Sequence, residues 1–212
     1  MSAPSPTEAW QSLVEGNRRF VAGEPLHPHQ DVERREDLAE GQRPTVAIFG
    51  CSDSRLAAEI IFDLGLGDAF VIRNAGQVAS DSAIGSIEYA VGVLDVPLIL
   101  VLGHDACGAV RAAIDSQGTD AGPLTPKIEA LIGPIVPAVR RIARARGDEP
   151  LDTASVDAAE VGREHLRDTI TDLLTGSELI SRKVVDGSLG IVGANYRLHD
   201  GTAVPDVLIG LS

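Results

Sequence analysis

The 212-residue chain is predicted to be an α/β protein: a single domain with a mostly parallel central β-sheet flanked by helices. Three apolar runs support this prediction, residues 45–50, 69–73 and 98–102, and each is followed by a segment with helical character. The runs do not alternate with polar residues, which is typical of parallel strands covered on both faces. Strands and helices that alternate in this way favour a parallel sheet with right-handed crossovers.

The N-terminal segment 1–40 is predicted to be a helical arm, and residues 45–212 are predicted to form the core. Residues 1–6 are expected to be disordered. A helix is expected to begin at Thr7, because apolar residues then recur at helical spacing, and the charged stretch 31–40 is expected to add a short exposed helix. Because the first helix is separated in sequence from the first strand, we expect the arm to pack on a partner subunit.

The other elements follow from local signals. Ser80 or Asp81 is expected to cap a helix, and Pro126 is expected to begin one that breaks at Gly133-Pro134, since proline lacks the N–H that a helix interior needs. The helices expected outside the arm are 56–63, 80–94, the segment after His104, the pieces on either side of Gly133, and 154–175. Two further strands are expected at 189–194 and 203–209, separated by the turn signal His199-Asp200-Gly201.

Charge and composition exclude several classes of partner. The formal net charge of −13 opposes binding to nucleic acid, which needs a basic surface. No run of 18 apolar residues is present, so no membrane span is expected. The N-terminus lacks the charged and apolar regions of a signal peptide, and the cytoplasm is the expected location. No glycine-rich phosphate-binding motif supports a nucleotide site.

The only two cysteines lie in two similar blocks, each of which follows a predicted strand. These blocks are Gly50-Cys51-Ser52-Asp53-Ser54-Arg55 and Gly103-His104-Asp105-Ala106-Cys107-Gly108. If the two strands are neighbours, the blocks meet at the carboxyl edge of the sheet, where open α/β folds bind ligands. Cys51, His104 and Cys107 would then supply three zinc ligands and leave a fourth position for water. The alternative, thiols buried as small apolar groups, is disfavoured because both lie beside glycine and polar residues.

Asp53 and Arg55 form a candidate catalytic pair. A planar guanidinium can hold a carboxylate through two hydrogen bonds, which keeps Asp53 ionised and oriented as an acceptor. Asp53 is also the oxygen ligand available for the fourth metal position. Such a pair is commonly a surface ion pair, but its place two residues after a metal ligand favours the catalytic interpretation.

The two blocks and their spacing resemble those of the β-class carbonic anhydrases. The resemblance covers the chain from about Trp10 to the last strand and includes the segments 70–75 and 86–90. It implies one Zn²⁺ per subunit, held by Cys51, His104 and Cys107, with Asp53 and Arg55 as the catalytic dyad. The implied activity is the reversible hydration of CO2 to bicarbonate and a proton by attack of zinc-bound hydroxide. The implied assembly is a homo-oligomer, either a dimer or a tetramer of dimers.

The same resemblance implies a set of substrate-binding residues. Phe70, Ala75 and Tyr89 fall where the family lines its narrow CO2 pocket, and the backbone N–H of Gly108 falls near the substrate. Gln42, nine residues before the first cysteine, is implied to enter the active site of the neighbouring subunit. From its own context, Gln42 would be interpreted only as a turn residue.

A further implication concerns control by bicarbonate. Family members with a bicarbonate-sensitive closed state tend to carry a tryptophan three residues before the first cysteine, and Ile48 stands there in this chain. We therefore expect no strong bicarbonate control, although Arg73 is present.

Three other functions are compatible with the same residues: hydrolysis of CS2 or COS by the same zinc hydroxide, thiol redox or zinc storage by Cys51 and Cys107, and a structural zinc domain with an acidic face. The remaining histidines suggest no further chemistry. His27 and His29 are interpreted as surface residues beside prolines, and His165, on the flank of the apolar face of its helix, as structural or exposed.

Overall fold

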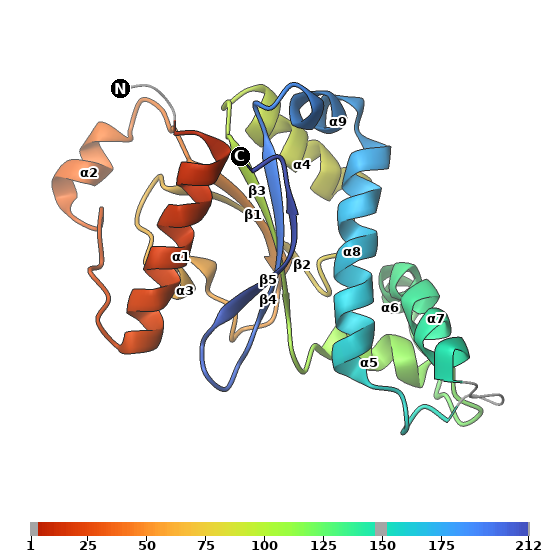
Figure 1. The fold of residues 1–212 in the computed structure, drawn as a ribbon. Coiled ribbons are helices and arrows are strands. Elements are labelled where there is room, and N and C mark those ends of the chain that lie inside the picture. Colours follow the sequence, from red (N-terminus) through yellow and green to blue (C-terminus); the bar gives the residue numbers. More distant parts are fainter. Residues whose placement is uncertain (1–3, 147–151, 212) are drawn as a thin grey trace.

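The computed structural model describes residues 4–146 and 152–211, which fold around a five-stranded sheet in the order β2-β1-β3-β4-β5 (Figure 1). Four of these strands are parallel: β1 (Val46–Cys51), β2 (Ala69–Asn74), β3 (Leu98–His104) and β4 (Gly190–Tyr196). The last strand, β5 (Ala203–Ile209), is antiparallel to β4. The predicted mostly parallel sheet is confirmed, and the chain switches direction across the sheet between β1 and β3.

Helices cover both faces of the sheet, and every residue of β1 and β3 is buried. Along β1, Val46 and Ile48 face one core and Ala47 and Phe49 face the other. The first core is closed on the sheet by α1 (Pro6–Ala22) and α3 (Ala58–Ile61). Its apolar cluster continues into α5 (Gly108–Asp115), α6 (Pro126–Ile132), the 3-10 turn η1 (Gly133–Ile135) and α7 (Val136–Arg146), and Figure 1 shows these helices beside α8. The second core is closed by α4 (Asp81–Gly92), α8 (Ala158–Gly176) and α9 (Glu178–Val185), which Figure 1 shows on the side opposite α1.

The first helix begins earlier than predicted. Ser5, not Thr7, is its N-cap: the Ser5 hydroxyl accepts a hydrogen bond from the Glu8 N–H, the Glu8 carboxylate accepts one from the Ser5 N–H, and Pro6 fills the first turn. The expected disorder of residues 1–6 is therefore wrong for Ser5 and Pro6, and residues 1–3 lie outside the described residues.

Helix α1 packs on the sheet of its own chain. Trp10 and Leu13 are buried in the first core, and the side chain of Asn17 hydrogen-bonds to the Ile61 and Gly201 carbonyls and to the Ala203 N–H. Helix α1 is thus part of the core of its own chain, and the expected packing of the arm on a partner subunit stays a prediction. The second arm helix, α2 (Val32–Asp37), buries no residue, as predicted for residues 31–40.

Three smaller differences separate the fold from the sequence-based expectation. Strand β2 is half-buried rather than fully buried because it forms an edge of the sheet. The helix expected at 56–63 is the shorter α3. Helix α9 was not predicted, because Gly176 and Ser177 resemble a helix end, whereas Ser177 caps a new helix. Within the described ranges, no helix has the length and apolar character needed to cross a membrane.

Candidate metal centre

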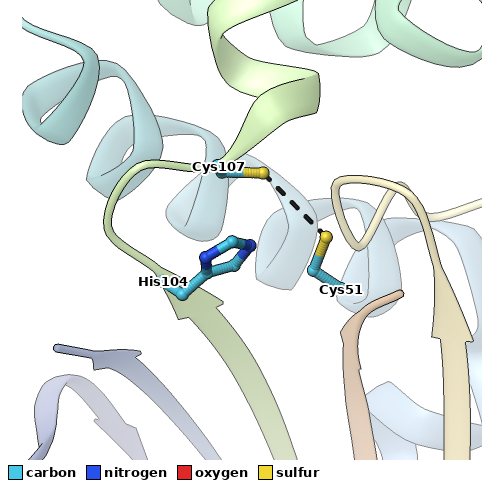
Figure 2. Close-up of side chains that lie close together, drawn as sticks. All are labelled: Cys51, His104 and Cys107. Carbon is cyan, nitrogen blue, oxygen red and sulfur yellow. Dashed lines mark hydrogen bonds between the residues drawn. The ribbon is translucent and has the colours of Figure 1, made fainter. Parts of the chain in front are cut away.

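Cys51, His104 and Cys107 come together at the carboxyl edge of the sheet (Figure 2). One ligand atom from each residue lies within 4.8 Å of the other two. The two sulfur atoms are 4.0 Å apart, about twice the length of a disulfide bond, and both cysteines are free. All three residues are buried, with about 5% of each exposed.

The backbone explains why residues so far apart in sequence meet. Strands β1 and β3 are parallel neighbours, with Gly50 opposite Leu102, so that Cys51 and His104 end their strands side by side. A tight turn follows His104, with Ala106 at a positive φ of 51°. This turn brings Cys107 to the N-cap of α5. The three side chains therefore lie at the switch point predicted from the sequence.

The chemistry of these donors fits a zinc ion. Nδ1 of His104 donates a hydrogen bond to the Asp105 carbonyl at 2.8 Å, so the proton of the neutral ring is on Nδ1. Nε2 then carries a free lone pair, and this buried atom has no hydrogen-bond partner among the described residues. A histidine ligand held by a backbone carbonyl in this way is typical of zinc sites. Two thiols and one imidazole nitrogen match a three-ligand zinc site.

The two thiols strongly affect each other's pKa. The hydrogen bond from Cys107 lowers the pKa of Cys51 to about 4, and the hydrogen bond from the backbone N–H of Gly76 acts in the same direction. The pKa of Cys107 is raised, first because its proton is held by the Cys51 sulfur and then because the thiol is buried. The metal-free pair thus holds one thiolate, and a bound cation would release the second proton.

Asp53 faces Arg55 rather than the three clustered residues. The Nε and Nη2 atoms of Arg55 donate to Oδ1 and Oδ2 of Asp53 at 2.8 Å and 2.7 Å, and the Arg55 N–H also donates to Oδ1 at 3.0 Å. This guanidinium holds the pKa of the Asp53 carboxyl well below its usual range. Arg55 also donates to the Ala106 carbonyl at 3.3 Å and so links the two sequence blocks.

Arg73 supports the loop that carries Cys51 and Asp53. From β2, its Nε donates to the Cys51 carbonyl at 3.0 Å and its Nη2 donates to the Asp53 carbonyl at 2.8 Å. The sequence drew attention to Arg73 only in relation to bicarbonate, because an arginine in an apolar strand does not reveal which carbonyls it contacts.

The residues implied to bind substrate lie at three separate places. Ala75 follows β2, and Gly108 is the first residue of α5, directly after Cys107. Phe70 and Tyr89 lie together on β2 and α4, with ring centroids 6.0 Å apart, and Tyr89 is 48% exposed. Gln42 is exposed and lines a surface cavity of about 360 Å³ beside α2. The structure thus brings Ala75 and Gly108 near the three clustered residues but not Gln42.

Two residues beside Cys51 were not predicted as part of the site. The Gly76 N–H donates to the Cys51 sulfur at 3.2 Å, and Nε2 of His165 contacts the Gly76 carbonyl at 2.7 Å. His165 is buried and Thr169, one helical turn later, is buried with it. Buried polar side chains need hydrogen-bond partners. The four-residue spacing of His165 and Thr169, which places both on the buried face of one helix, is the sequence signal that could have identified them.

Comparisons with known proteins agree with this geometry. The sequence matches the family described as carbonic anhydrase over residues 46–203. It is 49% identical over 206 residues to carbonic anhydrase 2 of Mycobacterium tuberculosis, covering 96% of this chain and 94% of that protein. It is 44% identical over 201 residues to the carbonic anhydrase of Mycolicibacterium smegmatis, covering 95% and 93%. Its fold resembles that of a tetrameric β-carbonic anhydrase from Sordaria macrospora, with a TM-score of 0.70, 23% identity and coverage of 93% and 96%.

Proposed function

The chain belongs to the β class of the carbonic anhydrase family and catalyses the zinc-dependent reversible hydration of CO2, and on this premise we propose roles for its individual residues. The observation that carries the proposal is the convergence of Cys51, His104 and Cys107 at the carboxyl edge of the sheet. Their Sγ, Nε2 and Sγ atoms would hold the zinc ion. When bound, zinc acts as a Lewis acid that lowers the pKa of water and so supplies a nucleophile near neutral pH.

Asp53 orients the attacking hydroxide. An ionised carboxylate has about four acceptor positions, and Arg55 fills two on Oδ1 and one on Oδ2. One position on Oδ2 remains for the O–H of the hydroxide. Because the ion pair with Arg55 keeps Asp53 ionised, this carboxylate would accept a hydrogen bond from the nucleophile that bound zinc supplies, and would so orient that nucleophile toward CO2.

Gly108 binds the anionic product. It is the first residue of α5, and the first N–H groups of a helix have no partner within the helix. Those N–H groups carry partial positive charge and favour anions. Gly108 is exposed, and a Cβ there would meet no atom within 4 Å, so bicarbonate has room to approach. Ala75, which directly follows β2, lines the substrate pocket on the side opposite Gly108 and makes it narrower.

Gln42, Phe70 and Tyr89 serve the active site of a partner subunit. Strand β1 spans five residue steps from Val46 to Cys51, or roughly 16 Å at about 3.3 Å per residue. Gln42 precedes Val46, so it lies beyond the amino end of this strand, whereas the zinc site lies at its carboxyl end. Phe70 pairs with Ala47, four residues before Cys51. Neither side chain is placed to reach its own zinc site. The pocket is therefore complete only in a homo-oligomer. Such an assembly would also cover the apolar residues that the arm exposes, which include Val21, Leu26 and Val32.

Mixing two inactive variants tests this shared site. We expect Gln42→Ala and Asp53→Asn each to lose most CO2 hydration. Refolded or co-expressed together, they form hetero-oligomers in which one site combines the intact Asp53 of one chain with the intact Gln42 of its partner. Activity should therefore recover toward a quarter of the wild-type value per chain, measured by stopped flow. A mixture with no more activity than its separate components would place Gln42 in the site of its own chain and contradict the proposal.

Bicarbonate is expected to act only as product. Ile48, Arg73 and Cys51 line a buried cavity of about 10 Å³, near the minimum for a single water molecule. The Nε and Nη2 atoms of Arg73 are already engaged by carbonyl oxygens. We therefore predict simple, non-cooperative product inhibition in initial-rate measurements with added bicarbonate. A steep cooperative loss of activity would contradict this prediction, and Ile48→Trp would then show whether this cavity is responsible.

The activity itself is tested by stopped-flow CO2 hydration with zinc measured on the same sample. Parallel assays with COS and CS2 determine which substrate is preferred. Zinc bound in a one-to-one ratio without hydration of CO2 would overturn the assignment. We also propose a cytoplasmic location, because a reducing compartment keeps both thiols available for zinc.

A further inference from the structure

His165 is a buried titratable residue that the reaction described above does not use. It lies on α8, with only 2% of its surface exposed, and is 89 residues from the group it contacts. Its Nε2 lies 2.7 Å from the Gly76 carbonyl oxygen. A carbonyl can only accept, so Nε2 carries the proton. Nδ1 is buried and has no hydrogen-bond partner within residues 4–146 and 152–211. Burial lowers the pKa of His165, which keeps the ring neutral.

Gly76 connects His165 to the zinc site. While its carbonyl accepts from His165, its N–H donates to the Cys51 sulfur at 3.2 Å. The residue has a φ of +81°, a conformation that favours glycine. A Cβ at this position would lie 2.9 Å from the Cβ of Ala109 and 3.1 Å from Cδ1 of Ile135. Gly76 thus has little room to move, and both of its polar backbone groups are engaged. Its N–H and its carbonyl belong to adjacent peptide planes that meet at Cα, so a hydrogen bond that fixes the carbonyl also limits rotation of the N–H.

We propose that His165 is a positioning residue for the zinc site: its Nε2–H fixes Gly76 so that the Gly76 N–H remains directed at the sulfur of Cys51. A hydrogen bond to a ligating thiolate disperses its negative charge and fixes the direction of its lone pairs. His165 thereby strengthens the grip on zinc without contacting the metal or the substrate. This inference rests on the assignment of Cys51 as a zinc ligand.

Two variants with the same chemical group test this role. In His165→Gln the amide N–H reaches approximately the place of Nε2, whereas in His165→Asn it is too short to reach the Gly76 carbonyl. We expect the Gln variant to bind zinc nearly as tightly as the wild type. We expect the Asn variant to bind it about tenfold more weakly, the lower end of the effect of lost outer-shell contacts. Affinity is measured by competition with a chromophoric chelator.

A spectroscopic measurement separates positioning from general loss of stability. After replacement of zinc by cobalt, the sulfur-to-metal charge-transfer band should shift in His165→Asn and remain in place in His165→Gln. Thr169→Val is the control: the Thr169 hydroxyl lies 2.9 Å from the backbone carbonyl oxygen of His165 and 3.3 Å from that of Gln77 in the same loop. Its loss leaves the His165 ring in place, so it should lower the melting temperature while zinc affinity and the charge-transfer band stay unchanged. If His165→Asn does not fold, His165→Leu replaces it.

Equal affinities and identical bands in the wild type and in the variant without the donor would overturn the inference. An equal loss of zinc affinity in the Gln and Asn variants would also overturn it, because the packing of the His165 ring, and not its hydrogen bond, would then account for the affinity. The band of the wild-type protein tests the sulfur-ligated metal site itself. The zinc site and the role of His165 can therefore fail separately.

Discussion

The Cys107→Ser variant is expected to lose stoichiometric zinc and at least about 100-fold of its CO2 hydration activity, a larger effect than that of outer-shell contacts. The thiolate, not the thiol, is the metal ligand, and a serine hydroxyl stays protonated near neutral pH. Two donors, Cys51 and His104, would then remain, which is too few for a stable zinc site. The measurement is zinc content after dialysis, together with stopped-flow activity.

The fold of this variant should persist. Serine nearly matches cysteine in volume, and the site lies at the edge of a sheet whose central strands are buried independently of the metal. Far-ultraviolet circular dichroism should therefore match that of the wild type. Ser52→Ala, an exposed change next to Cys51, should keep both zinc and activity. Full zinc content in Cys107→Ser would show that the metal is held elsewhere.

Cys51, His104 and Cys107 could be predicted as one site because the local strand pattern and the topology of a parallel sheet both place them at the same edge. Cys51 and His104 each follow a run of buried apolar residues, and parallel strands connected through helices end at the same edge of the sheet. The turn between β3 and α5 is then enough to bring Cys107 to the same place. None of these steps depends on knowing how the helices pack against one another.

The supporting contacts were not predictable for the opposite reason. Asn17 is satisfied by Gly201, 184 residues away, and His165 by Gly76, 89 residues away. A polar residue on an apolar stripe reveals that it has a partner but not which one. The edge position of β2 was hidden as well, because Phe70, Val71 and Ile72 are as apolar as the residues of a central strand.

The Asp53→Asn variant is expected to keep one zinc ion per chain and to lose about 100- to 10,000-fold in kcat, the range in which a positioned proton-accepting group contributes. Asparagine has one acceptor oxygen and a donor NH2, so it cannot both receive the fork of Arg55 and accept from the hydroxide. Three zinc ligands remain in place, and hence metal content should not change. Stopped-flow kinetics with zinc analysis measures both quantities.

Asp115→Asn is the matched control, because Asp115 also pairs with an arginine, Arg111, at 2.7 Å, but on the exposed surface of α5. Exposed ion pairs contribute at most about 1 kcal/mol to stability, so this variant should retain wild-type turnover. A thiol redox or zinc-storage protein would tolerate both changes equally, since neither alters the sulfurs. Only a hydratase requires the carboxylate at position 53 and not the one at 115. Wild-type turnover in Asp53→Asn would therefore remove Asp53 from the reaction even if zinc and fold were intact.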